Sequence, residues 1–256
     1  MGDPSPIGAQ ALQAKVALVS GGAGGIGAAI VRALAASGAT VLVGYNRSAT
    51  SAEALVASLP GVGHRAMPAP VTDTQAIEAL AGDVERLFGR LDILVNCAGT
   101  TRFVAHGDLD GLDDELIDRV LAVNVRGPIA MVRAFRTLLA QSGDGLVVNI
   151  SSIAAVTAMG SNIAYCASKA AVDNLTKSLA RALAPQIRVV SVSPGLVDTE
   201  FVKGLDPEWR DRQAAQTPLA RLSAPEEVAN AVLALASLLT FTTGSVIPVD
   251  GGRPLS

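Results

Sequence analysis

The chain has 256 residues, of which 50% are hydrophobic and 17% are charged, and its formal net charge is −3. This length allows one large domain or two small ones, and the slight negative charge provides no basic surface of the kind that binds nucleic acid. No apolar run reaches the ~18 residues of a membrane span, and the first residues show no basic region followed by an apolar core, so we expect neither a membrane partner nor a secretory signal.

Residues 1–14 are rich in Pro, Gly and Ala, which predicts a flexible N-terminal segment. The remainder, residues 15–256, shows no change in composition that would mark a domain boundary, so we expect a single domain. Short apolar runs rich in β-branched residues predict strands that are buried on both faces, as in a parallel sheet. These strands are expected at residues 16–20, 40–45, 92–99, 146–152 and 188–195, with weaker candidates at 64–70 and 245–249.

Segments with helical periodicity separate the predicted strands. Residues 73–88, for example, place Ile77, Leu80 and Val84 on one stripe, and Asp73 is a suitable N-cap. Further helices are expected at residues 25–37, 112–122, 127–141, 162–183 and 225–239. The alternation of strand and helix predicts an α/β fold: a single-domain Rossmann fold with a doubly wound parallel sheet of about seven strands.

The first predicted strand runs directly into the glycine cluster SGGAGGIG, residues 20–27, which opens a helix. Gly21, Gly25 and Gly27 matter because a turn this tight needs positive φ or a close backbone approach. The N–H groups and the dipole at the start of the following helix favour a bound pyrophosphate. A glycine-rich turn without a ligand is the alternative, but the position between strand and helix favours a nucleotide-binding loop.

The segment Ser20-Gly21-x3-Gly25-Ile26-Gly27 resembles the Thr-Gly-x3-Gly-x-Gly loop of the short-chain dehydrogenase/reductase family. The family's other motifs follow in order between about residues 15 and 252: Asn-Asn-Ala-Gly (here NCAG), a mid-chain Asn, a Ser thirteen residues before the Tyr of Tyr-x3-Lys, and Pro-Gly. The residues that match are Asn96, Ala98, Gly99, Asn124, Ser152, Tyr165, Lys169, Pro194 and Gly195. The resemblance implies an NAD(P)-dependent oxidoreductase that moves a hydride between a nicotinamide cofactor and a ketone/secondary alcohol substrate.

Tyr165 and Lys169 stand four residues apart in a predicted helix and therefore on one face of it. An isolated pair of this kind is more often a chance surface pair, but the other motifs stand in register with it. A nearby ammonium stabilises a phenolate, which suits a general acid/base. The resemblance implies that Tyr165 is the acid/base and that Lys169 both lowers the pKa of Tyr165 and binds the nicotinamide ribose. It also implies that Ser152 holds the substrate oxygen, and Ser151 is the alternative for this role. Asn124 is implied to position a water that relays protons.

The end of the second predicted strand carries the sequence GYNRS, in which Tyr45 replaces the Asp that NAD-preferring relatives usually have. Arg47 could meet a 2′-phosphate, and Asn46 and Ser48 could add hydrogen bonds. We therefore expect NADP(H) to be preferred over NAD(H). The alternative is that Arg47 is a solvated loop charge, and Gly24 stands where many NADP-preferring relatives carry a basic residue.

The family's usual adenine-binding Asp is replaced by Pro70, which leaves Val71 and the backbone for adenine contacts. Residues 196–222 are charged and include Trp209, which predicts a substrate lid. By resemblance, the backbone of Val197 contacts the carboxamide and Thr199 contacts the pyrophosphate. The pattern looks like 3-oxoacyl-(acyl-carrier-protein) reductases and related sugar, polyol and steroid dehydrogenases, so we expect a small carbonyl or alcohol substrate.

Two other functions are compatible with the fold. An extended-family epimerase or dehydratase needs a larger C-terminal domain than the roughly 60 residues that follow the sixth strand. A catalytically silent nucleotide-sensing or scaffold protein would be free to lose Ser152, Tyr165 or Lys169, and all three are present.

The small residues around Tyr165 suit close packing on the sheet, or between subunits, and the resemblance implies a homo-oligomer, either a dimer or a tetramer. Cys97 and Cys166 lie in apolar segments and are expected to be core thiols rather than a disulfide, which indicates a reducing compartment and a cytoplasmic location. His64 and His106 have no Cys, His or acidic residue at ligand spacing, so no metal site is expected.

Overall fold

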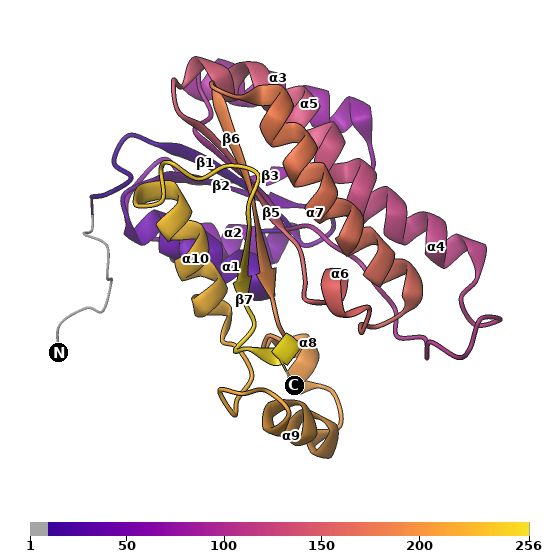
Figure 1. Ribbon diagram of the computed structural model, residues 1–256. Helices are drawn as coiled ribbons and strands as arrows, with labels where there is room; N and C mark the ends of the chain where they lie inside the picture. The colour runs from indigo at the N-terminus through magenta and orange to yellow at the C-terminus, as the bar shows by residue number, and fades with distance from the viewer. Residues whose placement is uncertain (1–9, 256) are drawn as a thin grey trace, which may run out of the picture.

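The computed structural model describes residues 10–255, and these form a parallel sheet between two layers of helices (Figure 1). Within this range the sheet has seven strands in the order β3-β2-β1-β4-β5-β6-β7, and all neighbouring strands are parallel. The strands are β1 (Val16–Ser20), β2 (Thr40–Tyr45), β3 (Arg65–Pro68), β4 (Ile93–Asn96), β5 (Gly145–Ile150), β6 (Ile187–Pro194) and β7 (Val246–Val249). The predicted doubly wound Rossmann fold is therefore confirmed.

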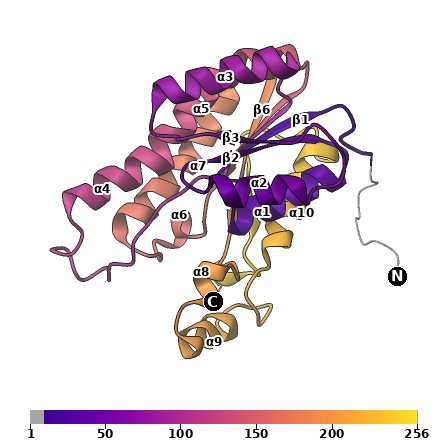
Figure 2. The same ribbon diagram turned by 180° about the vertical axis from the view of Figure 1, so that it is seen from behind.

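Both faces of the sheet are covered by helices, as the view from behind also shows (Figure 2). The helices of one face are α1 (Gly25–Ala36), α2 (Ala49–Ala57) and α10 (Pro225–Ser237). Those of the other face are α3 (Thr74–Phe88), α5 (Gly127–Gln141) and α7 (Ile163–Leu183). Val19 of β1 belongs to the core of the first face and Leu18 to the core of the second, and both are fully buried. Burial on both faces explains why the strands are continuous apolar runs rather than alternating ones.

The predicted helix 112–122 differs from the observed one. Asp113 accepts a hydrogen bond from the backbone N–H of Leu116, and this N-cap makes α4 (Asp114–Leu121) begin two residues later. The chain then passes through the π-helical turn η1 (Ala122–Arg126) into α5. Turns of this kind are frequent at functional sites, and this one holds Asn124.

Other boundaries also shift. The strand predicted at 92–99 ends at Asn96, because the next residues turn away from the sheet toward the candidate site. Helix α2 was not predicted, since only Ala52 and Leu55 of its nine residues are buried and its apolar pattern is correspondingly weak. The predicted N-cap of α3 is confirmed, because the carboxylate of Asp73 accepts from the N–H of Ala76. The short elements are α6 (Ala154–Thr157), α8 (Glu200–Lys203), α9 (Pro207–Ala215) and η2 (Arg253–Leu255).

Part of the segment 1–14, predicted to be flexible, lies outside the described residues. Of the part that is described, Leu12 is buried and its N–H donates to the C=O of Ser37. None of the helices found within residues 10–255 is both long and apolar enough to cross a membrane.

The strand order places the candidate site. The sequence order reverses between β1 and β4, and ligands of open α/β sheets bind at the carboxyl ends of the strands at such a point. Ser20 pairs in register with Asn96, and Asn96 pairs with Asn149. At this edge β1 and β4 end level with each other, and β5 ends one residue later.

Candidate active site

The glycine loop between β1 and α1 is folded tightly on itself. Gly21 and Gly25 have φ values of +66° and +50°, which lie in the left-handed region that favours glycine. A Cβ atom at Gly27 would lie 2.2 Å from the C=O oxygen of Gly21, so no larger residue fits there. The N-cap of α1, Gly24, has no side chain to bond the first N–H groups of the helix, and Ile26 in this turn is half-buried. The loop is therefore built from backbone N–H groups that suit an anion.

The loop lies against the segment that follows β4. A Cβ atom at Gly21 would lie 2.9 Å from the Cα of Ala98. The buried hydroxyl of Ser20 donates to the C=O of Val95 and accepts from the N–H groups of Cys97 (3.1 Å) and Ala98 (3.2 Å). The side chain of Ser20 thus joins the two loops from beneath and does not face outward.

Asn96 is buried as well. Its Nδ2 donates to Oδ1 of Asn149 over 2.9 Å, and Nδ2 of Asn149 donates to the hydroxyl of Thr176 over 2.8 Å. This polar chain connects β4, β5 and α7 below the site. The side chain of Asn96 therefore aligns these elements, while the half-buried Cys97 and Ala98 and the exposed Gly99 form the rim of the site.

Asn124 lies in the π-helical turn with its side chain buried. Its Oδ1 accepts from the N–H of Thr100 (2.8 Å), and its Nδ2 donates to the C=O of Thr100 (3.1 Å) and to the hydroxyl of Ser168 (3.1 Å). A Cβ atom at Gly99 would lie 3.6 Å from Oδ1 of Asn124 and 3.9 Å from Nζ of Lys169. Gly99, Asn124 and Lys169 thus converge, as the motifs predict.

Tyr165 and Lys169 are brought together on α7. The ammonium of Lys169 lies 5.6 Å from the centre of the Tyr165 ring and donates to the C=O of Ile150 over 2.8 Å. Lys169 is only 7% exposed, and within residues 10–255 no carboxylate forms an ion pair with it. Burial raises the pKa of the neighbouring Cys97 thiol to about 11, although the Lys169 ammonium acts in the opposite direction. Among these neighbours, the buried cation of Lys169 is the group that lies against the Tyr165 ring.

The two candidate serines at the end of β5 differ in what their hydroxyls do. Ser151 is buried, and its hydroxyl donates to the backbone C=O of Lys169 at 3.4 Å. Ser152 is half-buried, and its oxygen accepts from the N–H of Ala154 at 3.2 Å, which leaves its proton for another acceptor. This arrangement favours Ser152 over Ser151 as the residue that meets a ligand.

The end of β2 presents the predicted selectivity residues. Tyr45 is half-buried, whereas Asn46, Arg47 and Ser48 are exposed. Within residues 10–255, Arg47 makes no hydrogen bond or ion pair. Helix α2 begins directly after Ser48, whose side chain caps no N–H group. This helix N-terminus is not among the helices expected from the sequence, although a Ser followed by helix-forming residues is a signal for it.

Two other predicted contacts have clear surroundings. The side chain of Val71 is buried, and a Cβ atom at Gly127 would lie 3.1 Å from it, so Val71 packs on the start of α5. The C=O of Pro70 accepts from the N–H of Asp73. A Cβ atom at Gly24 would have no atom within 4 Å apart from those of its chain neighbours. The position at which many NADP-preferring relatives carry a basic residue is therefore open to solvent.

The predicted lid leaves the sheet at Pro194 and Gly195. Its two ends are paired, because the N–H of Asp198 donates to the C=O of Ser223 and the N–H of Ser223 donates to the C=O of Leu196. Val197 is buried at this junction. The Thr199 side chain caps α8, and a Cβ atom at Gly25 would lie 3.4 Å from it. The lid therefore begins directly over the glycine loop.

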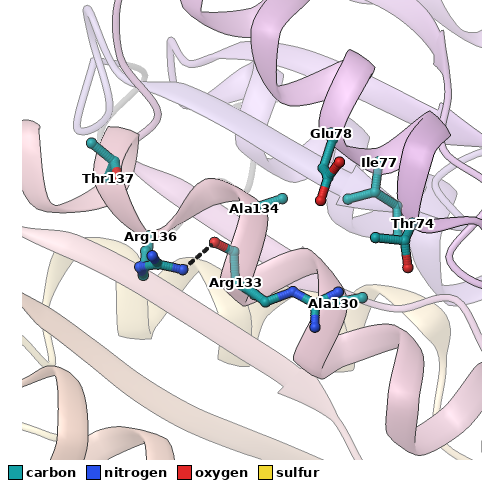
Figure 3. A pocket seen from close by; sticks show the side chains of 8 residues that line it. All are labelled: Thr74, Ile77, Glu78, Ala130, Arg133, Ala134, Arg136 and Thr137. Atoms are coloured by element: carbon teal, nitrogen blue, oxygen red, sulfur yellow. Dashed lines mark hydrogen bonds between the residues drawn. The ribbon is translucent and has the colours of Figure 1, made fainter.

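A pocket of about 410 Å³ lies elsewhere, between α3 and α5 (Figure 3). In it, Arg136 donates to the backbone C=O of Arg133 over 2.8 Å. Its lining residues are Thr74, Ile77, Glu78, Ala130, Arg133, Ala134, Arg136 and Thr137, and none of them is a predicted site residue. Within residues 10–255, no three His, Cys, Asp or Glu side chains form a cluster that could hold a metal ion, and Cys97 and Cys166 are both free thiols.

Comparisons with known proteins agree with this arrangement. A family model described as "Enoyl-(Acyl carrier protein) reductase" matches residues 21–253. The chain is 39% identical over 245 residues to the "Granaticin polyketide synthase putative ketoacyl reductase 2" of Streptomyces violaceoruber, covering 95% of this chain and 97% of that protein. It is 36% identical over 245 residues to a 3-oxoacyl-(acyl-carrier-protein) reductase of Thermotoga maritima, covering 94% and 98%.

Among solved structures, a crystal structure titled as a "putative short-chain dehydrogenase/reductase from Burkholderia xenovorans" superposes with a TM-score of 0.87 and 37% identity, over 94% of this chain and 98% of that one. The family model and these relatives each span nearly the whole chain. The protein therefore belongs to the short-chain dehydrogenase/reductase family of NAD(P)-dependent oxidoreductases.

Proposed function

We propose that this enzyme transfers a hydride between a nicotinamide cofactor and a ketone/secondary alcohol substrate, with Tyr165 as the acid/base. The observation that carries the proposal is the buried ammonium of Lys169, 5.6 Å from the centre of the Tyr165 ring and without a carboxylate partner among residues 10–255. Such a cation stabilises a phenolate over a phenol. Lys169 also lies close to the ends of two strands, because its ammonium bonds the C=O of Ile150 in β5 and would lie 3.9 Å from a Cβ atom at Gly99, which follows β4.

The residues present fit a dinucleotide. Gly21, Gly25, Gly27 and the open N-terminus of α1 would hold the pyrophosphate, with Thr199 above them. Asn96–Gly99 and Lys169 would flank the nicotinamide ribose, and the backbone of Val197 would meet the carboxamide. When bound, the nicotinamide supplies or accepts the hydride.

The side chains then have distinct roles in the reduction of a ketone. The hydroxyl of Ser152 donates to the substrate oxygen and holds it beside Tyr165. The phenol of Tyr165 gives its proton to that oxygen as the hydride arrives at the carbon, and in the oxidation of an alcohol the phenolate takes the proton back. Lys169 stabilises the phenolate, and Asn124 would place a water that returns the proton through Lys169.

Loss of the acid/base tests this mechanism. In Tyr165→Phe we expect kcat to fall by about 10³-fold, since positioned acid/base catalysis contributes on the order of 10²–10⁴-fold, while the Kd for the cofactor changes little. Ser152→Ala should lower kcat by about 10²-fold. Ser151→Ala is its matched control and should keep kcat within about threefold, because that hydroxyl bonds α7. Full turnover by Tyr165→Phe would refute the proposal.

We also propose that the cofactor is NADP(H) in preference to NAD(H). Arg47 is exposed and unpaired within the described residues, the N-terminus of α2 adds N–H groups beside it, and no carboxylate ends β2. An arginine matches a phosphate through two parallel hydrogen bonds.

A fluorescence titration with NADPH and NADH tests this preference. Arg47→Ala should weaken NADPH binding by about 10- to 100-fold, as expected for loss of a charge-assisted contact, and leave NADH binding nearly unchanged. Arg86→Ala, which removes an exposed arginine from α3, is the control and should alter neither. Tighter NADH than NADPH binding by the unmodified enzyme would contradict the proposal.

For the substrate we propose a small ketone/secondary alcohol pair. The relatives include a ketoacyl reductase, a cis-4-hydroxycyclohexanecarboxylate dehydrogenase 38% identical to this chain and a D-threitol dehydrogenase 38% identical to it. Acyclic 3-oxoacyl thioesters, cyclic alcohols and polyols are therefore the first compounds to assay. A cytoplasmic location and a homo-oligomer, dimeric or tetrameric, remain predictions that fractionation and light scattering would check.

A further inference from the structure

Tyr165 lies in the first turn of α7, where the backbone N–H groups need hydrogen-bond partners from outside the helix. Asn162 is the N-cap of the helix, so Tyr165 is its third residue. The first four N–H groups of a helix have no partner inside it, and helix ends open more easily than helix centres. Lys169, in contrast, stands in the second turn, is buried and bonds the C=O of Ile150. The distance between phenol and ammonium therefore depends on a closed first turn.

The side chain of Asn162 closes this turn. It is 1% exposed, and its Oδ1 accepts from the backbone N–H of Tyr165 itself over 2.7 Å. Its Nδ2 donates to the C=O of Arg102 (2.7 Å) and to the hydroxyl of Thr101 (3.1 Å). The same side chain thus caps α7 and ties it to the loop that follows β4.

Neighbouring contacts strengthen this tie. The N–H of Val104 donates to the C=O of Ser161 over 2.8 Å, and the hydroxyls of Thr101 and Ser161 are bonded. Asn124 holds Thr100 of the same loop. The loop is therefore fixed to η1 on one side and to the first turn of α7 on the other.

The amide of asparagine suits this position better than a carboxylate does. Asp73 caps α3 and Asp113 caps α4, and each accepts from the N–H of the third helical residue, as Asn162 does. A carboxylate has no proton to give, whereas Asn162 also donates two hydrogen bonds. A negative charge here would also oppose the phenolate form of Tyr165.

We propose that Asn162 is a positioning residue for the proposed acid/base: it locks the first turn of α7 against the loop 100–104 and so keeps the phenol of Tyr165 beside the ammonium of Lys169. This inference rests on the proposed function of Tyr165.

Lys169 is the charge that faces the phenol in this arrangement. Burial raises the pKa of the Cys97 thiol to about 11 and also raises the pKa of the Cys166 thiol. On the clamped loop, the guanidinium of Arg102 is paired with Asp113 at 2.7 Å. If the first turn of α7 were loosened, the ammonium of Lys169 would therefore stabilise the phenolate of Tyr165 less.

The test is the pH profile of kcat for alcohol oxidation at saturating cofactor. In Asn162→Ala the pH of half-maximal rate should rise by about one unit, because the phenolate loses stabilisation, and kcat at neutral pH should fall about tenfold. Asn162→Ser keeps a cap acceptor but not the donation to Arg102, so it should fold well and shift the profile by about half as much.

Asp73→Ala is the matched control, because it removes a cap of the same geometry from α3. It should lower stability by ~1 kcal/mol, a 5-fold change in the unfolding equilibrium, which is less than for Asn162→Ala because Asn162 also donates two hydrogen bonds, and it should leave the profile in place. If Asn162→Ala or Asn162→Ser loses stability while its profile coincides with that of the unmodified enzyme, Asn162 is merely a helix cap and the inference is wrong. Full turnover by Tyr165→Phe would instead refute the proposed function.

Discussion

The two ends of the central strands differ in whether a buried charged side chain has a partner of opposite charge. At the amino end, before β4, the buried carboxylate of Asp92 receives hydrogen bonds from Lys15, Arg90 and the backbone N–H of Val16. At the carboxyl end, the buried ammonium of Lys169 has a C=O and an aromatic ring for neighbours and no carboxylate among the described residues. One end neutralises its buried charge, and the other leaves it without a carboxylate partner among the described residues, as the proposed role of Tyr165 requires.

This difference suggests that the amino end of the central strands contributes to stability, whereas the carboxyl end is the candidate for function. Burial alone would raise the pKa of Asp92, but the bonds from Arg90, Val16 and Lys15 outweigh it and lower that pKa. A buried charge without a counter-charge costs stability, and such sites are candidates for function. Substitutions at the two ends should therefore have opposite effects.

The largest effect is expected at the carboxyl end. Lys169→Met should lower kcat by about 10²–10³-fold, because the phenolate of Tyr165 loses its cation. The free energy of unfolding should change by less than about 1 kcal/mol, since a similar volume is kept and a buried charge is removed. Urea unfolding and steady-state kinetics measure both. A decrease of several kcal/mol in the free energy of unfolding would show that Lys169 also stabilises the fold, and it would contradict the contrast between the two ends of the strands.

The amino end should show the reverse. Asp92→Ala leaves the buried N–H of Val16 unpaired and removes the partner of Lys15 and Arg90, so stability should fall by about 2–3 kcal/mol. The value of kcat should stay within about twofold. Asp144→Ala, which breaks the half-exposed pair with Arg188, is the control and should cost at most about 0.5 kcal/mol.

The smallest effect is a pH dependence. The folded-state pKa of Asp92 is depressed, so its stabilisation is fully present above the unfolded-state pKa of about 4 and is lost as pH falls through the folded-state value. The gap in stability between the unmodified enzyme and Asp92→Asn should thus be widest near pH 7 and narrow toward pH 3. If the stability difference instead widened as the pH fell, a group other than Asp92 would dominate the pH dependence of stability.

Several parts of the site could be predicted because their geometry is local. The positive φ of Gly21 and Gly25 and the shared helix face of Tyr165 and Lys169 follow from neighbours along the chain. Ser20 begins the predicted nucleotide-binding loop and is expected to contact the cofactor with it, but only the structure shows that its hydroxyl bonds the loop after β4, because that loop lies more than 70 residues away. Helix α2 was missed because little of it is buried.

The sequence by itself determined the strands, the glycine turn and the spacing of the proposed acid/base pair, because each depends on backbone preferences or on side chains within one or two helical turns. The order of the motifs along the chain also indicated the family. The tertiary structure decided which distant groups meet: Asp92 with Lys15, Ser20 with the β4 loop, and Asn162 with Arg102. These contacts exist because the sheet order places β1 beside β4 and the loop after β4 beside α7, an arrangement that no local pattern encodes.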